Sequence, residues 1–140
     1  MDDTSISRLL QTEKKVLVIG LSKDGSKPSN QIPNYLLSAG YEVTGINPTV
    51  STSAIGVIPV FQKISDLPVD FSPGILVVFR PSAEAGAAAR QALEAKPGIR
   101  AVWLQLGIVS EEAGKLAESR GIAFVQDRCI MVEHKRLFGV

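Results

Sequence analysis

The chain has 140 residues, a length typical of one domain, and 45% of its residues are hydrophobic while 21% are charged. Its net charge of +1 excludes a broad attraction to nucleic acid or to an anionic membrane, so any phosphate recognition must be local. One cysteine, Cys129, and one histidine, His134, are too few for an internal disulfide or a four-ligand zinc site. The acidic first residues and the lack of an apolar run of about 20 residues predict a cytoplasmic protein.

The first predicted strand is residues 15–20, a β-branched run that is closed by glycine. Residues 30–39 then have a helical pattern. Because Pro33 is tolerated only in the first turn, we expect this helix to begin close to residue 31 or 32 and to end at Gly40.

A second strand is predicted at residues 41–46, where Asn47 and Pro48 stop it. Residues 49–54 are small and polar, which is typical of an exposed loop. Residues 61–67 favour at most a short helix.

The second half of the chain alternates strands with helices. Strands are predicted at 75–79, 101–104 and 122–125, and helices at 83–95, 111–120 and from about residue 130. Ser82 and Ser110 directly precede two of these helices, so we expect both to cap them.

Alternating strands and helices predict βαβ units, and therefore an α/β, Rossmann-like, three-layer fold over residues 1–140. We expect a single domain with a five-stranded parallel sheet in the order 3-2-1-4-5. Ligands of such sheets bind beyond the carboxyl ends of the strands, near the point where the strand order reverses. The segments that follow the five strands should therefore converge on one edge.

Residues 20–30, after the first strand, are rich in Gly, Ser and Lys and lead into the amino end of a helix. Free amides and a partial positive charge at that end can hold a phosphate, and Lys23 and Lys27 can add charge. A solvated surface loop is an equally good interpretation of the loop alone. The segment lacks G-x-G-x-x-G and G-K-[ST], and Asn47-Pro48 stands where NAD sites carry an acidic residue.

Several longer segments of the sequence resemble small stand-alone CoA-binding proteins, whose domain is similar to the CoA-binding part of the succinyl-CoA synthetase α subunit. The resemblance runs from about Leu9 to Leu137. It is carried by Val18-Ile19-Gly20-Leu21-Ser22, Lys27-Pro28-Ser29, Asn47-Pro48, Val78-Phe79-Arg80-Pro81-Ser82, Trp103-Leu104-Gln105-Leu106-Gly107 and Asp127-Arg128-Cys129.

This resemblance implies a domain that binds coenzyme A, a small-molecule ligand, through its phosphates. Loop residues would hold the phosphates, residues after the second and third strands would contact the nucleotide, and residues after the fourth would lie near the pantetheine arm. The expected contacts are Gly20, Ser22, Lys27, Ser29, Asn47, Pro48, Phe79, Arg80, Ser82, Leu106 and Gly107.

A catalytic group is hard to find in the sequence. His134 follows Glu133 directly, and adjacent helical residues do not face one another, so we expect His134 to have a packing role. Cys129 fits a small buried residue better than a redox thiol, and Asp127 suits a ligand contact and a structural role equally. We therefore expect a binding module without a reaction of its own.

Two other hypotheses stay open from the sequence. The first is an enzyme that acts on an acyl-CoA or a nucleotide, with Asp127 or His134 as its acid–base group. The second is a protein-interaction domain with a vestigial nucleotide site. The sequence neither indicates nor excludes a protein partner.

Overall fold

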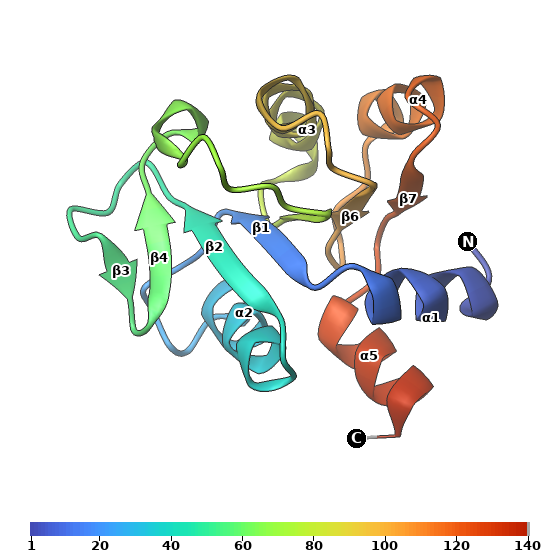
Figure 1. Ribbon diagram of the computed structural model, residues 1–140, viewed down its shortest axis with the longest axis horizontal. Coiled ribbons are helices and arrows are strands. Elements are labelled where there is room, and N and C mark those ends of the chain that lie inside the picture. Colours follow the sequence, from blue (N-terminus) through green and yellow to red (C-terminus); the bar gives the residue numbers. More distant parts are fainter. Residues whose placement is uncertain (140) are drawn as a thin grey trace.

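Seven strands form the central sheet of the computed structural model, which describes residues 1–139 (Figure 1). Every neighbouring pair is parallel except β3 and β4, which form an antiparallel hairpin at one edge. The order across the sheet is β3 (Ala54–Ile55), β4 (Ile58–Phe61), β2 (Glu42–Ile46), β1 (Lys15–Ile19), β5 (Ile75–Val78), β6 (Ala101–Leu104) and β7 (Ala123–Val125).

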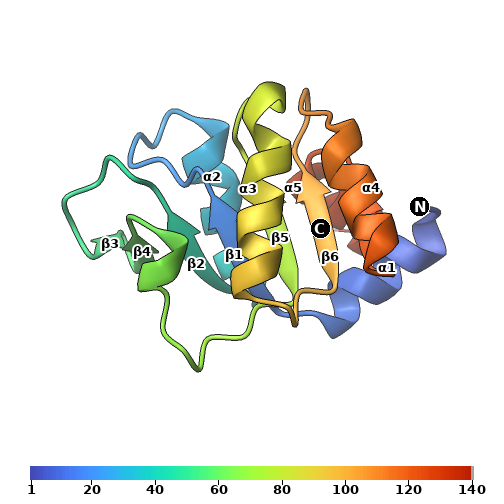
Figure 2. The same cartoon turned by 90° about the horizontal axis from the view of Figure 1, so that it is seen from above.

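Helices cover both faces of the sheet, which confirms the Rossmann-like three-layer class (Figures 1 and 2). One face carries α1 (Asp3–Thr12), α2 (Pro28–Ser38) and α5 (Ile130–Phe138). The other carries α3 (Ser82–Ala95), α4 (Glu111–Ser119) and the short 3₁₀ helix η1 (Ile64–Asp66). Trp103 is fully buried on the first face, as expected for a core residue, and its Nε1 donates to the Arg128 carbonyl at 2.8 Å.

The predicted strand order is wrong for the five strands that the sequence indicated. These strands lie in the order 2-1-3-4-5, because β4 occupies the place beside β2. The prediction lacks β4, which contains Pro59, a residue that is untypical of a central strand. The proline is tolerated because β4 pairs with β2 only through Val60 and Phe61, which follow it.

Helix α2 begins at Pro28, earlier than the sequence predicted, and Pro33 lies inside it. A proline at that position cannot donate to the carbonyl of Ser29 four residues back. That carbonyl accepts instead from the Ser22 N–H at 3.1 Å. The proline therefore frees an acceptor that ties the loop after β1 to the first turn of α2.

Other boundaries agree in part with the prediction. The 49–54 loop is exposed except for Val50, which is buried, and the expected 61–67 helix is only η1. Ser110 caps α4 by accepting from the Ala113 N–H at 3.1 Å, as predicted. Helix α1 was not predicted, because we recognised no helical pattern before residue 15. Within residues 1–139 no helix combines the length and the apolar character needed to cross a membrane.

Candidate functional site

The segment from residue 20 to residue 27, here called the β1–α2 loop, is braced from within. Asn30 Nδ2 donates to the Ser22 carbonyl at 2.8 Å, and Ser22 Oγ accepts from the Asp24 N–H at 3.0 Å. Asp24 in turn accepts from both the N–H and the hydroxyl of Ser26. These hydrogen bonds hold the pKa of Asp24 below its usual range, so the loop carries one negative charge besides its two lysines.

The amino end of α2 has no side-chain cap. Lys27 is the N-cap residue and makes no capping hydrogen bond, and Pro28 occupies the first helical position. Within residues 1–139 we find no acceptor for the N–H groups of Lys23, Gly25 and Ser29. These groups and the helix dipole suit an anion at this end.

Gly20 ends β1 and allows β5 to approach closely. Its φ of +94° would be strained for any residue with a side chain. Its N–H donates to the Ile46 carbonyl at 2.9 Å. A Cβ atom at this position would lie 3.2 Å from the Cβ of Phe79. The glycine thus keeps open the junction between the loop and the groove described next.

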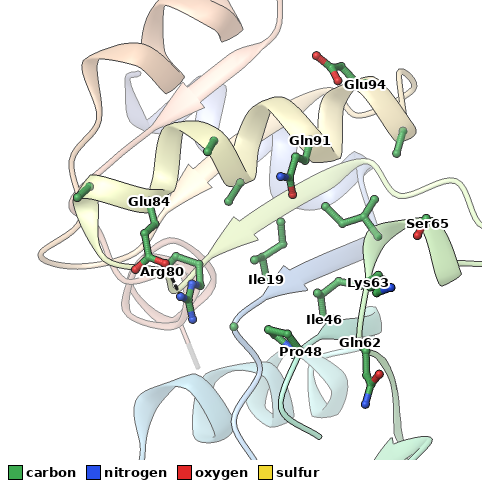
Figure 3. A pocket seen from close by; sticks show the side chains of 16 residues that line it. Ile19, Ile46, Pro48, Gln62, Lys63, Ser65, Arg80, Glu84, Gln91 and Glu94 are labelled. Atoms are coloured by element: carbon green, nitrogen blue, oxygen red, sulfur yellow. Dashed lines mark hydrogen bonds and ion pairs between the residues drawn. The ribbon is translucent and has the colours of Figure 1, made fainter.

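A groove with a volume of about 890 Å³ runs along α3 from the carboxyl ends of β1 and β2. Its apolar lining includes side chains from β1, β2, η1 and α3, and a polar rim surrounds it (Figure 3). In Figure 3 Arg80 and Pro48 lie on either side of the end of β1, and Gln91 projects from α3. The apolar lining consists of Ile19, Ile46, Pro48, Ile64, Ala83, Ala87, Ala88 and Ala95.

Several polar groups near the groove are already engaged within the protein. Arg80 forms an ion pair with Glu84, one turn further along α3. Asn47 Nδ2 donates to the Leu21 carbonyl at 2.9 Å, and Asn47 Oδ1 accepts from the N–H and the hydroxyl of Thr49. Asn47 therefore connects the loops after β1 and β2, and its side chain has little capacity left for a ligand.

The segment from residue 105 to residue 110, here called the β6–α4 loop, is fastened by side chains at its backbone amides. The Gly107 N–H donates to Asp127 Oδ1 at 2.7 Å, and the Val109 N–H donates to Ser82 Oγ at 3.0 Å. Ser82 is the first residue of α3 and does not cap it, so the predicted cap is wrong. Leu106 is exposed at the tip of this loop.

His134 has the packing role that the sequence favoured. It is buried among aromatic rings, and its Nδ1 shares a hydrogen bond of 2.6 Å with the hydroxyl of Tyr35 on α2. Burial and the nearby Lys14 ammonium lower the pKa of His134. Cys129 is a half-buried free thiol that packs against the core at the start of α5. The Nη1 atom of Arg128 lies 3.8 Å from Oε1 of Glu133.

The structure brings together only some of the predicted contact residues. Gly20, Pro48 and Arg80 line the groove, and Ser22, Lys27 and Ser29 belong to the adjoining loop and helix end. The other five do not line the groove: Asn47 and Ser82 brace loops, Phe79 packs beneath Gly20, and Leu106 and Gly107 lie on the β6–α4 loop.

The η1 side of the groove was missed because β4 was missed. Gln62, Lys63, Ile64 and Ser65 follow β4 at the same edge of the sheet, so recognising 58–61 as a strand would have placed them there. Within residues 1–139, no cluster of three or more His, Cys, Asp or Glu side chains is arranged to hold a metal ion.

Comparisons with known proteins agree with this architecture. Residues 14–135 match the model of the CoA binding domain family. The chain is 35% identical over 130 residues to YneT of Bacillus subtilis (strain 168), a protein described as uncharacterized, and the match covers 92% of this chain and 91% of YneT.

Two solved structures superpose over nearly the whole chain. The cell-free ID.343 protein from Thermus thermophilus has 35% identity and a TM-score of 0.86, covering 99% of this chain and 100% of that one. A hypothetical protein from Pyrococcus horikoshii OT3 has 28% identity and a TM-score of 0.87, covering 99% and 94%. With its matched span, its parallel sheet and its uncapped α2, this chain belongs to the family of CoA-binding domains.

Proposed function

We propose that this chain binds coenzyme A, with the diphosphate at the amino end of α2 and the adenine in the groove, and that it carries out no reaction of its own. The observation that carries this proposal is the continuity of the two features. Gly20 both lines the groove and begins the loop that carries the free N–H groups of Lys23 and Gly25 and leads to that of Ser29 in α2. One nucleotide can therefore use an apolar groove and an anion-binding helix end together.

Coenzyme A fits this arrangement better than NAD. Dinucleotide sites place a carboxylate at the end of the second strand, where it accepts hydrogen bonds from the ribose hydroxyls. Here that position is Asn47, whose amide group is committed to Leu21 and Thr49. The family membership of the chain points to the same ligand.

The alternative of an enzyme finds little support in the arrangement of the two candidate acid–base groups. His134 is buried on the side of the sheet covered by α1, α2 and α5, where Tyr35 occupies its Nδ1, whereas the groove lies on the α3 side. Asp127 accepts from the Gly107 N–H. Neither group lines the groove, which favours binding without chemistry.

Isothermal titration calorimetry with CoA, dephospho-CoA, NAD and ATP tests the ligand. We expect CoA to bind most tightly, and tighter binding of NAD would refute the ligand assignment. The reaction-free part is tested with acetyl-CoA and longer acyl-CoA thioesters and a thiol-trapping dye. Hydrolysis faster than about 1 s⁻¹, an ordinary enzyme rate, that is abolished by His134→Ala would favour the enzyme instead.

A further inference from the structure

The rim of the groove carries one cation that its neighbours leave unused. Arg80 is ion-paired with Glu84, and Gln62 Nε2 donates to the Val50 carbonyl at 2.6 Å. Lys63 also lines the groove and is exposed. Within residues 1–139 we find no ion pair or hydrogen bond for its amine. Lys63 is therefore the lining cation that is available to a ligand.

The sheet register places Lys63 beside Pro48. Strands β2 and β4 pair Ile46 with Phe61, and the Asn47 N–H donates to the Phe61 carbonyl at 2.9 Å. Two further steps along both strands lead to Pro48 and Lys63, which lie near each other in Figure 3. If the adenine lies in the groove and the diphosphate at α2, the ribose that joins them lies at the Gly20 and Pro48 end of the groove.

The carboxylates of the groove do not oppose a phosphate beside Lys63. Glu84 is neutralised by Arg80, and Glu94 lies in the last turn of α3, at the far end of the groove (Figure 3). On the β2 side the polar group nearest the strand end is the Asn47 amide, which carries no charge. An additional phosphate on the ribose would thus meet a free ammonium, while Asp66 of η1 and Glu94 of α3 are the exposed carboxylates of these elements without an ion pair within residues 1–139.

We propose that Lys63 binds the 3′-phosphate on the ribose of coenzyme A and so makes the site select CoA over dephospho-CoA. This inference rests on the proposed function. It adds a specificity-determining residue on η1's side of the groove, outside the β1–α2 loop that holds the diphosphate.

The test is calorimetric titration of wild type and Lys63→Ala with CoA and dephospho-CoA. Wild type should bind CoA about five- to tenfold more tightly than dephospho-CoA, the scale of one exposed charge-assisted contact. In Lys63→Ala this ratio should fall below about twofold, with the affinity for dephospho-CoA unchanged. Lys63→Arg should retain most of the ratio. Lys115→Ala, which removes an exposed lysine of α4, is the matched control and should leave it unchanged.

Two outcomes overturn the inference in distinguishable ways. If CoA binds but the ratio is near one in wild type, or survives in Lys63→Ala, Lys63 is not the phosphate contact while the proposed function stands. If neither CoA nor dephospho-CoA binds to wild type, the proposed function fails and this inference fails with it. Adenosine 3′,5′-bisphosphate and AMP, compared in the same way, isolate the 3′-phosphate from the pantetheine arm.

Discussion

The β1–α2 loop and the β6–α4 loop lie at the same carboxyl edge of the sheet, but they differ in which backbone amides the protein leaves without an acceptor. In the β1–α2 loop and the first turn of α2, the N–H groups of Lys23, Gly25 and Ser29 find no acceptor within residues 1–139. An apolar groove opens beside them at Gly20.

In the β6–α4 loop, side chains accept hydrogen bonds from three of the backbone amides. The N–H groups of Gly107, Val109 and Ser110 donate to the side-chain oxygens of Asp127, Ser82 and Gln126, respectively. The Asp127 N–H also donates to the Ile108 carbonyl at 3.2 Å. Side chains from other segments thus brace the β6–α4 loop, whereas the β1–α2 loop keeps the N–H groups of Lys23 and Gly25 without an acceptor within residues 1–139. The two loops differ in their unused hydrogen-bonding capacity, and only the β1–α2 loop carries charged side chains.

The substitution with the largest expected effect is Gly20→Ala, at the start of the β1–α2 loop. The new Cβ would press on Phe79 at a φ of +94°, so we expect a loss of about 1–3 kcal/mol in the free energy of unfolding and at least about a tenfold loss of CoA affinity. Urea denaturation and calorimetry measure the two effects.

Gly40→Ala is the matched control for this substitution. Gly40 has a nearly equal φ of +98°, a Cβ atom added there would meet no atom within 4 Å, and the residue does not line the groove. The variant should therefore lose stability but keep its CoA affinity. If Gly40→Ala lost CoA affinity as strongly as Gly20→Ala, backbone strain alone would explain the effect and the groove would not be implicated.

Lys27→Ala also tests the β1–α2 loop, because it removes a positive charge without straining the backbone. Lys27 is exposed at the uncapped start of α2, so the fold should be unaffected and CoA binding should weaken by about 1–2 kcal/mol. Calorimetry at two salt concentrations checks both the loss and its electrostatic origin. An unchanged dissociation constant at moderate salt would show that Lys27 is a solvated surface lysine outside the CoA site.

Asp127→Ala tests the braced side. Asp127 has a φ of +58° and accepts from the Gly107 N–H, so alanine should lower the free energy of unfolding by about 1–2 kcal/mol. Asp127→Asn keeps both an acceptor and a tolerance for this φ, and it should be nearly neutral. The affinity for adenosine 3′,5′-bisphosphate, which has no pantetheine arm, should not change in either variant. A large loss of that affinity in Asp127→Ala would contradict the prediction that the β6–α4 loop does not contribute to nucleotide binding.

The smallest expected effect is a pH dependence of stability, and it comes from His134 on α5, outside both loops. His134 contacts the hydroxyl of Tyr35 and the rings of Tyr41 and Phe138, and the Lys14 ammonium is the nearby charge that acts on it. Because its pKa is lower in the folded state, the unfolded chain binds the proton more readily. Stability should therefore fall as the pH drops through the ordinary histidine pKa of about 6.5, with a slope of at most about 1.4 kcal/mol per pH unit.

Urea denaturation of wild type and His134→Gln at several pH values between 7.5 and 5.5 measures this slope. The glutamine variant should lack it in that range. The aspartates with lowered pKa values, Asp2, Asp3 and Asp24, act only at more acidic pH. An equal slope in both proteins would show that His134 does not cause the effect.

The fold was predictable where local pattern and tertiary role coincide. The β-branched runs at 15–20 and 75–79 are buried strands, and Ser110 caps α4. Prediction failed at two prolines, because a proline's position relative to its hydrogen-bonding partners depends on tertiary structure. Pro59 precedes the part of β4 that pairs with β2, and Pro33 leaves the carbonyl of Ser29 free to accept from the Ser22 N–H.

The site was predictable only as far as strand ends could be recognised. Gly20, Pro48 and Arg80 follow strands that the sequence indicated, and they do line the groove. Asn47 and Ser82 have residue types that suit a ligand equally well, but their hydrogen-bonding groups are used by Leu21 and Val109. A sequence shows which polar groups exist, and only the folded arrangement shows which of them are already satisfied.

The central claim is that the nucleotide uses the β1–α2 loop and the groove, and it is tested most directly by following backbone amide NMR signals during titration with adenosine 3′,5′-bisphosphate. We expect large shifts for Lys23, Gly25, Ser29 and Ala87, with the amides of Gly107 and Val109 nearly unshifted because their N–H groups already donate to side chains. Shifts concentrated in the β6–α4 loop, with the β1–α2 loop unmoved, would contradict it.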